Sequence, residues 1–151
     1  MMHNIAMDHE IVTLGGFTVV GFSSEGLGQG IPGTWQQLAA RRADWPSSAQ
    51  YGVGQPTMGN LWFLAGVRLP DGAVAPDGLE VAAVPAGRYL KQPYRGDRRQ
   101  MASQVTRLFS SVVPALTESC QEPMLFIVEY AGDVSEPGQP QIDCELFVQL
   151  G

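Results

Sequence analysis

Two segments of the chain follow the same order of patterns, and this internal similarity limits the folds that the chain can adopt. The segment VTLGGFTVVGFSSEGLGQGIPGTWQQL begins at Val12, and VAAVPAGRYLKQPYRGDRRQMASQVTRL begins at Val81. Each starts with β-branched residues, passes through a break of small residues into a second apolar run, and ends in a helical pattern. The sequence therefore predicts one supersecondary unit that occurs twice.

Apolar runs rich in β-branched and aromatic residues predict the strands. A double-glycine break at Gly15 and Gly16 divides the first run, and Pro85, Ala86 and Gly87 divide a later one. The predicted strands are residues 11–23, 60–69, 79–94, 124–132 and 142–150. A shorter piece, residues 50–54, is expected to add an edge strand.

Two segments have apolar residues at helical spacing. In residues 32–45, Thr34 is expected to cap the first turn, with Gln37 three residues later as in a capping box. In residues 96–114, Asp97 is the expected N-cap and Pro114 the end. The apolar stripes of both helices are interpreted as core rather than as binding surface.

The order of the elements is strand, helix, strand, strand, and then the same again. The turn-rich PDGAVAPDG at residues 70–78 separates internal repeats of about residues 10–69 and 79–151. A half of about 70 residues can hardly close its own core, so residues 1–151 are expected to form one domain. The predicted fold is α+β with pseudo-twofold symmetry: an antiparallel sheet, two helices on one face, and a ligand cleft between the halves.

Composition excludes several classes of function. The net charge of −6 argues against a nucleic-acid partner, because binding to phosphates depends on clustered Lys and Arg. No apolar run of 18 residues and no secretory signal occurs, which predicts a cytoplasmic protein without a membrane partner. Cys120 and Cys144 lack a CxxC spacing, and His3 and His9 lack a third ligand. Neither a metal site nor a cofactor is therefore expected.

Two carboxylates stand within apolar strands, where side chains alternate between the faces of a sheet. Glu145 shares a face with Asp143 and Phe147, and Glu129 shares a face with Leu125 and Ile127. Spacing alone leaves open whether these glutamates are solvated or buried. A buried carboxylate needs a compensating cation or hydrogen-bond donor.

Aromatic rings near such a carboxylate predict a site for an amphipathic cation. The repeat gives Trp62 and Phe63 a position equivalent, within one residue, to that of Cys144 and Glu145, so rings and carboxylate are expected to converge. The candidate ligand-binding residues are Glu145, Glu129, Trp62, Phe63, Tyr51, Trp35, Tyr89 and Phe147.

Several segments together resemble the GyrI-like small-molecule-binding domain, which is also the effector-binding half of AraC-type and multidrug-responsive bacterial regulators. These segments are GTWQQL, YGVG, WFLAGVRL, LEVAAVPAGRYLKQPYRG and the terminal CELFVQL, and the resemblance extends from about residue 10 to residue 150. It implies a tandem strand-helix-strand-strand fold with a cleft for bulky, often cationic compounds. It also implies an acidic residue at the ligand, which we place at Glu145, with Glu129 as the second choice. The chain has no helix-turn-helix segment, so the resemblance does not extend to DNA binding.

The first hypothesis for function is a stand-alone small-molecule-binding protein that senses or sequesters bulky amphipathic cations. The sequence leaves open whether it acts as a monomer or as a homodimer. One alternative is a hydrolase of reactive natural products that uses Glu145 as a general acid or base. The sequence has no nucleophile triad and no phosphate-binding loop, so binding is favoured over catalysis. The other alternative is a protein-binding modulator of the gyrase-inhibitor type.

Overall fold

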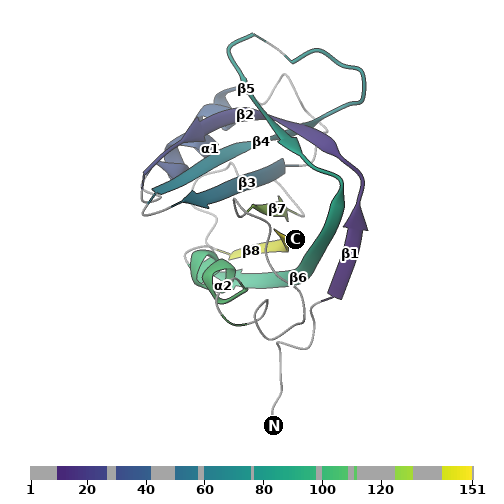
Figure 1. Cartoon of the computed structure of the whole chain (residues 1–151). Helices are drawn as coiled ribbons and strands as arrows, with labels where there is room; N and C mark the ends of the chain where they lie inside the picture. The colour runs from purple at the N-terminus through teal and green to yellow at the C-terminus, as the bar shows by residue number, and fades with distance from the viewer. Residues whose placement is uncertain are drawn as a thin grey trace.

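Eight strands and two helices make up the part of the chain that the computed structural model describes (Figure 1). The described residues are 10–26, 30–41, 50–57, 60–75, 77–97, 100–108, 111, 125–130 and 141–150. The strands are β1 (Glu10–Leu14), β2 (Phe17–Ser24), β3 (Gln50–Thr57), β4 (Asn60–Leu69), β5 (Glu80–Val84), β6 (Gly87–Asp97), β7 (Phe126–Tyr130) and β8 (Gln141–Gln149). The helices are α1 (Ile31–Ala40) and α2 (Met101–Arg107).

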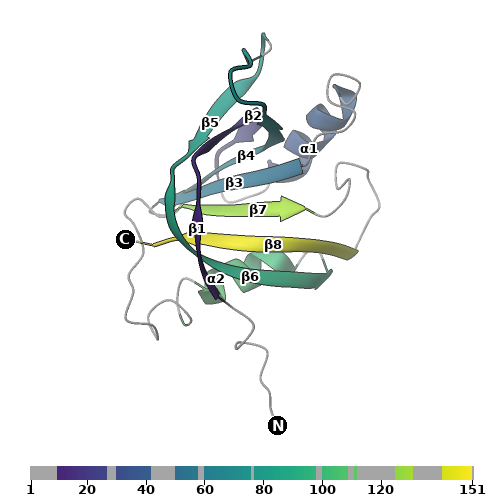
Figure 2. The same ribbon diagram turned by 90° about the vertical axis from the view of Figure 1, so that its right-hand side faces the viewer.

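The strands form one curled sheet in the order β1-β6-β8-β7-β3-β4-β2-β5 (Figures 1 and 2). Every neighbouring pair in this order is antiparallel. The α+β class and the antiparallel sheet predicted from the sequence are therefore confirmed.

A pair of bends connects the two ends of the sheet. Strand β1 continues into β2 through Gly15 and Gly16, and β5 continues into β6 through Pro85 and Ala86. Because β1 pairs with β6 and β2 pairs with β5, the two bends lie next to each other. The resulting ribbon passes in front of the sheet in Figure 2. Glycine and proline are suited to this place because both interrupt regular ladder pairing.

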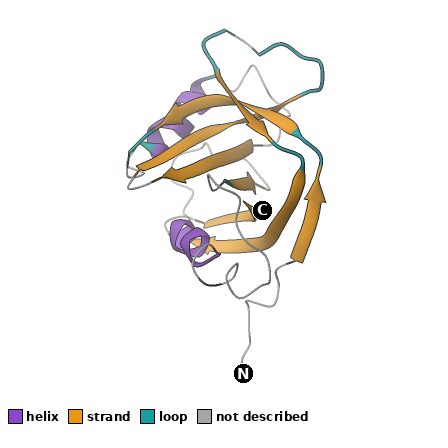
Figure 3. Ribbon diagram, in the orientation of Figure 1, coloured by secondary structure: helices purple, strands orange, loops and turns teal. Residues whose placement is uncertain are grey.

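Both helices cover the same side of the sheet, as predicted (Figure 3). Trp35 and Leu38 of α1, Val105 of α2 and Leu108 directly after α2 belong to one buried apolar cluster. A second cluster, which includes Val19, Val53, Leu64, Tyr89 and Ile127, contains no residue of either helix. Within the described residues, no helix is long and apolar enough to span a membrane.

Three local expectations were wrong. Strand β3 is longer than predicted and lies in the middle of the sheet, because it pairs with both β4 and β7. Thr34 does not cap α1: Gly30 holds the cap position, and the Thr34 hydroxyl donates a hydrogen bond to the Ile31 carbonyl at 2.6 Å. Asp97 ends β6, and Gln100 precedes α2 instead. The expected helix end at Pro114 lies outside the described residues.

The turn-rich linker between β4 and β5 is confirmed as a pair of turns. Gly72 and Gly78 have φ angles of 79° and 84°, a region that glycine adopts without the steric clash of a Cβ atom. The Asp-Gly signals in the sequence therefore mark these turns correctly.

Candidate functional site

The candidate site lies on the face of the sheet that neither α1 nor α2 covers, which we call the open face. Figure 2 views the molecule from this side, with both helices behind the sheet. The second apolar cluster belongs to this face, and Phe17, Val12, Leu14 and Trp62 pack against it. Its charged members determine what the face can bind.

Two carboxylates lie opposite each other on the open face. Glu129 of β7 and Glu145 of β8 are register partners in the antiparallel ladder. Side chains in such positions have Cβ atoms about 4.5–5.5 Å apart, and like charges there are destabilising. The alternation of β7 and β8 therefore gives both glutamates the face that the sequence predicted.

Tyr51 completes the row next to Glu129. It is the register partner of Glu129 on β3, and its hydroxyl donates a hydrogen bond to Glu129 Oε2 at 2.6 Å. Burial, followed by this hydrogen bond and the charge of Glu129, raises the pKa of Tyr51 to about 12, although Arg68 acts in the opposite direction. The phenol is therefore a donor that holds one oxygen of Glu129.

Arg68 and Phe17 flank Tyr51. The Phe17 and Tyr51 ring centroids are 5.3 Å apart, and the Arg68 guanidinium carbon lies 4.5 Å from the Phe17 centroid. An arginine above an aromatic face gains a cation–π interaction of about 0.5–1 kcal/mol where the pair is exposed. This side of the row thus already holds a positive charge.

The two carboxylate oxygens of Glu145 have different environments. Oε1 lies 3.8 Å from Lys91 Nζ, beyond hydrogen-bonding distance, and the two side chains are 38% and 30% exposed. Oε2 is buried and has no hydrogen-bond partner among the described residues. The neighbour of Glu145 on β6 is Pro93, which has no N–H to donate. Glu145 is therefore an incompletely paired carboxylate.

Three of the predicted aromatic residues also belong to the open face. Phe147 is 6% exposed, Trp62 is partly buried, and Tyr89 is fully buried, with its hydroxyl donating a hydrogen bond to the Pro85 carbonyl at 2.8 Å. Phe147 stands two residues from Glu145 on the same face of β8. These rings give the face its apolar character.

Trp35 and Phe63 lie on the opposite side of the sheet. Their ring centroids are 6.3 Å apart, and Tyr130 makes an edge contact with Trp35 at 5.2 Å within the helix-side cluster. Phe63 therefore does not converge with Glu145, because alternation sends Phe63 and its neighbour Trp62 to different faces. Whether Trp35 and Phe63 contact a ligand stays a prediction.

Sequence reasoning did not identify Lys91, Arg68 or Phe17 as members of the open face near the carboxylates. Alternation along β6 puts Lys91 on the face of Tyr89, and this signal was readable. Its proximity to Glu145 depends on the pairing of β6 with β8, which no single strand reveals.

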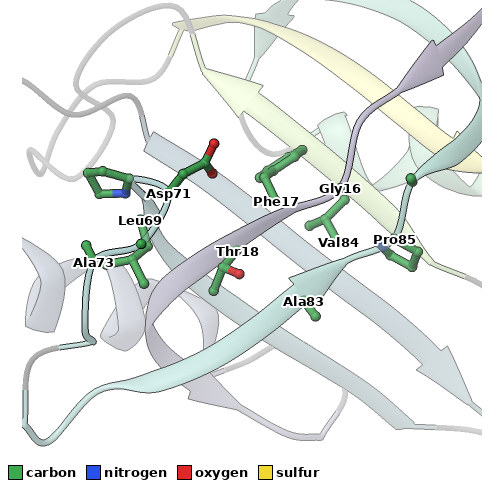
Figure 4. Close-up of a pocket in the computed structure, with 12 residues that line it drawn as sticks. Gly16, Phe17, Thr18, Leu69, Asp71, Ala73, Ala83, Val84 and Pro85 are labelled. Carbon is green, nitrogen blue, oxygen red and sulfur yellow. The ribbon is translucent and has the colours of Figure 1, made fainter.

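A shallow depression lies at the bends between β1 and β2 and between β5 and β6. Its volume is about 410 Å³, and its lining includes Phe17, Leu69, Asp71, Val84 and Pro85. Figure 4 shows Asp71 next to Phe17, with Val84 and Pro85 further across the view. None of the predicted site residues lines this depression. Across the described parts of the chain, no group of three or more His, Cys, Asp or Glu could hold a metal ion.

Several solved structures share the fold. The protein SAV2435, solved bound to tetraphenylphosphonium, matches with a TM-score of 0.68 and 14% identity, over 95% of this chain and 94% of that chain. The integron cassette protein VCH_CASS2 from the mobile metagenome of Vibrio cholerae matches with a TM-score of 0.68 and 15% identity, over 95% and 96%. A bacterial transcription regulation protein from Staphylococcus aureus MU50 matches with a TM-score of 0.62 and 14% identity, over 93% and 97%. Identities this low show a common fold.

Sequence comparison supplies the family. No curated protein matches the chain. The model of the family Cass2, integron-associated effector binding protein, matches residues 10–147 and confirms the resemblance to GyrI-like effector-binding domains. The chain therefore belongs to the Cass2 family of integron-associated effector-binding proteins.

Proposed function

We propose that this protein binds bulky amphipathic cations on its open face, with Glu145 as the residue that pairs with the positive charge. The family is one of effector-binding proteins, and one structure of the same fold holds tetraphenylphosphonium, a lipophilic cation. Both facts support a small-molecule ligand.

The observation that carries the proposal is the incomplete pairing of Glu145. Its Oε2 atom is buried without a partner among the described residues, and Lys91 is too far from Oε1 to donate a hydrogen bond. A carboxylate oxygen removed from water without a partner is unfavourable by about 1–3 kcal/mol. A bound cation would compensate for this, which favours ligand binding at Glu145 over a purely structural role.

The neighbouring residues have complementary roles in the proposed site. Glu129 doubles the negative charge next to Glu145, while Tyr51 holds one Glu129 oxygen. Trp62, which is partly buried, supplies aromatic surface on the same face, and the buried Phe147 belongs to the apolar cluster of that face. Lipophilic cations combine charge with large apolar groups, so this combination fits them better than it fits small inorganic cations.

We also propose that the chain is a tandem repeat of about residues 10–69 and 79–151. The supporting observation is the order of the sheet: exchanging β1 with β5, β2 with β6, β3 with β7 and β4 with β8 reverses β1-β6-β8-β7-β3-β4-β2-β5 into itself. A pseudo-twofold axis between β3 and β7 accounts for this reversal. In this proposal one domain senses or sequesters its ligand in the cytoplasm.

Calorimetric titration with tetraphenylphosphonium tests the binding proposal. We expect saturable binding by the wild type and at least a tenfold loss in Glu145→Gln, because a charge-assisted contact contributes about 1.5–3 kcal/mol. Asp143→Asn is the matched control, since Asp143 lies on the same face of the same strand but pairs with Arg95 at 2.9 Å. No binding by the wild type, or equal losses in both variants, contradicts the proposal.

A second candidate is hydrolysis of a reactive ligand, which the Tyr51–Glu129 hydrogen bond favours, because a phenol and a carboxylate in contact can move a proton. Product formation distinguishes it from binding. If turnover is lost in Tyr51→Phe while affinity is kept, the protein is an enzyme.

A further inference from the structure

We propose that Lys91 competes with a cationic ligand for Glu145. In the free protein, the ammonium group of Lys91 occupies the position near Glu145 that the ligand's positive charge takes when it binds. This inference rests on the proposed function, because it concerns how the same carboxylate is made available to a cation. It identifies Lys91 as a residue that sets the affinity of the site.

The distance between the charges is the first reason. Lys91 Nζ lies 3.8 Å from Glu145 Oε1, which is close enough for attraction but too far for a hydrogen bond. Both side chains are about one-third exposed, and ion pairs of this kind contribute only about 0–1 kcal/mol. The pair therefore opens readily when a better-fitting cation arrives.

The strand register is the second reason. Lys91 is not the register partner of Glu145: it stands opposite Phe147 on β8 and opposite Glu10 on β1. The ammonium group thus reaches Glu145 diagonally, and a second carboxylate, that of Glu10, stands directly across from it. A lysine displaced from Glu145 can turn toward Glu10 without entering an apolar environment.

The third reason is repulsion. While Lys91 stays near Glu145, a cationic ligand that approaches the same carboxylate meets a like charge at close range. The free energy needed to displace Lys91 therefore reduces the affinity of the wild type for every cation. The affinity for a neutral ligand of the same shape is not reduced in this way. Charge dependence is what separates competition by Lys91 from a steric or structural role.

The molecule contains a matched control for this experiment. Arg95 is on the same strand and face as Lys91, and it pairs with Asp143 of β8 at 2.9 Å, with 82% and 53% exposed side chains. Arg95→Gln removes one positive charge from the same region but does not free Glu145. A general change in the surface field would affect binding equally in Lys91→Gln and Arg95→Gln.

The test is calorimetric titration of the full chain with tetraphenylphosphonium and with tetraphenylmethane, its neutral isostere, in one buffer of fixed ionic strength and co-solvent content. Lys91→Gln should bind the cation about threefold to tenfold more tightly than the wild type, and Lys91→Arg should bind like the wild type. Arg95→Gln should stay within about twofold of the wild type, and the neutral analogue should bind all variants equally.

The outcomes separate the two proposals. If the wild type binds the cation but Lys91→Gln does not bind it more tightly, or if Arg95→Gln gains as much, competition by Lys91 is overturned while the binding site stands. If neither the wild type nor Lys91→Gln binds the cation, the proposed function and this inference fail together.

Discussion

Glu129 and Glu145 face each other across neighbouring strands of the sheet, so two carboxylates stand side by side on a face that neither α1 nor α2 covers. Tyr51 hydrogen-bonds to the first, and Lys91 lies near the second without a hydrogen bond. The arrangement sacrifices some stability to keep negative charge concentrated at one place on the sheet.

Neutralising Glu145 should stabilise the protein. Glu145→Gln removes the repulsion with Glu129, and we expect the free energy of unfolding to rise by about 0.5 kcal/mol after the loss of the weak Lys91 pair. Urea denaturation measures this change. Asp143→Asn, which breaks the exposed pair with Arg95, should leave stability unchanged or lower it slightly. A destabilised Glu145→Gln contradicts the expectation.

The hydroxyl groups of the two buried tyrosines should contribute differently to the free energy of unfolding. Tyr51→Phe removes a donor to the Glu129 carboxylate and should lower the free energy of unfolding by about 1.5–3 kcal/mol. Tyr89→Phe removes a donor to the neutral Pro85 carbonyl and should lower it by about 0.5–1.5 kcal/mol. Denaturation of both variants gives the comparison, and a larger loss in Tyr89→Phe would show that charge does not strengthen the Tyr51 bond.

Alkaline pH should destabilise the fold through the same tyrosines. Burial raises the pKa of both Tyr51 and Tyr89 to about 12, against about 10 in an unfolded chain. The unfolded state therefore loses these protons first, so stability is fully present below about pH 10 and falls as the pH rises toward 12. Thermal unfolding from pH 8 to 12 measures the decline, which should be less steep in the Tyr51→Phe, Tyr89→Phe double variant.

A single methyl group between β2 and β4 should disrupt the sheet. Gly21 and Gly66 are register partners, and a Cβ atom on Gly21 would lie 1.9 Å from the Ala65 carbonyl oxygen. Because this atom is backbone and cannot rotate away, Gly21→Ala should lower the free energy of unfolding by about 3 kcal/mol or more. Gly15→Ala is the control, since a Cβ there has no atom within 4 Å. Equal stability of the two variants would show that the strands can separate at no cost.

Local pattern was sufficient for most strands. Strand β4 has the predicted bounds, since its apolar run ends at a proline, and the breaks at Gly15 and Pro85 lie between strands as predicted. The central place of β3 was not predictable, because its pairing with β7 joins residues more than 70 positions apart along the chain. Strand propensity predicts which residues form strands, but it does not predict which strands pair with each other.

The candidate site shows the same division. Alternation assigned Glu145 and Glu129 to their faces correctly, since the period of two is a property of each strand alone. The row of Tyr51, Glu129 and Glu145 depends on two registers, β3 with β7 and β7 with β8, and neither can be counted from one strand. Trp62 and Phe63 were grouped as neighbours in sequence, although neighbours on a strand face away from each other.

The bends at Gly15–Gly16 and Pro85–Ala86 also determine how the chain holds itself together. Strand β1 comes before the linker at residues 70–78 yet pairs with β6, which comes after it, and β5 comes after the linker yet pairs with β2. Each part of the chain thus contributes one edge strand to the other part, β1 from the first and β5 from the second. This exchange resembles that of a domain-swapped dimer, but it occurs within a single molecule. We therefore expect two fragments cut at the linker to stay associated through the pairs β1–β6, β2–β5 and β3–β7, because neither fragment contains a complete sheet of its own.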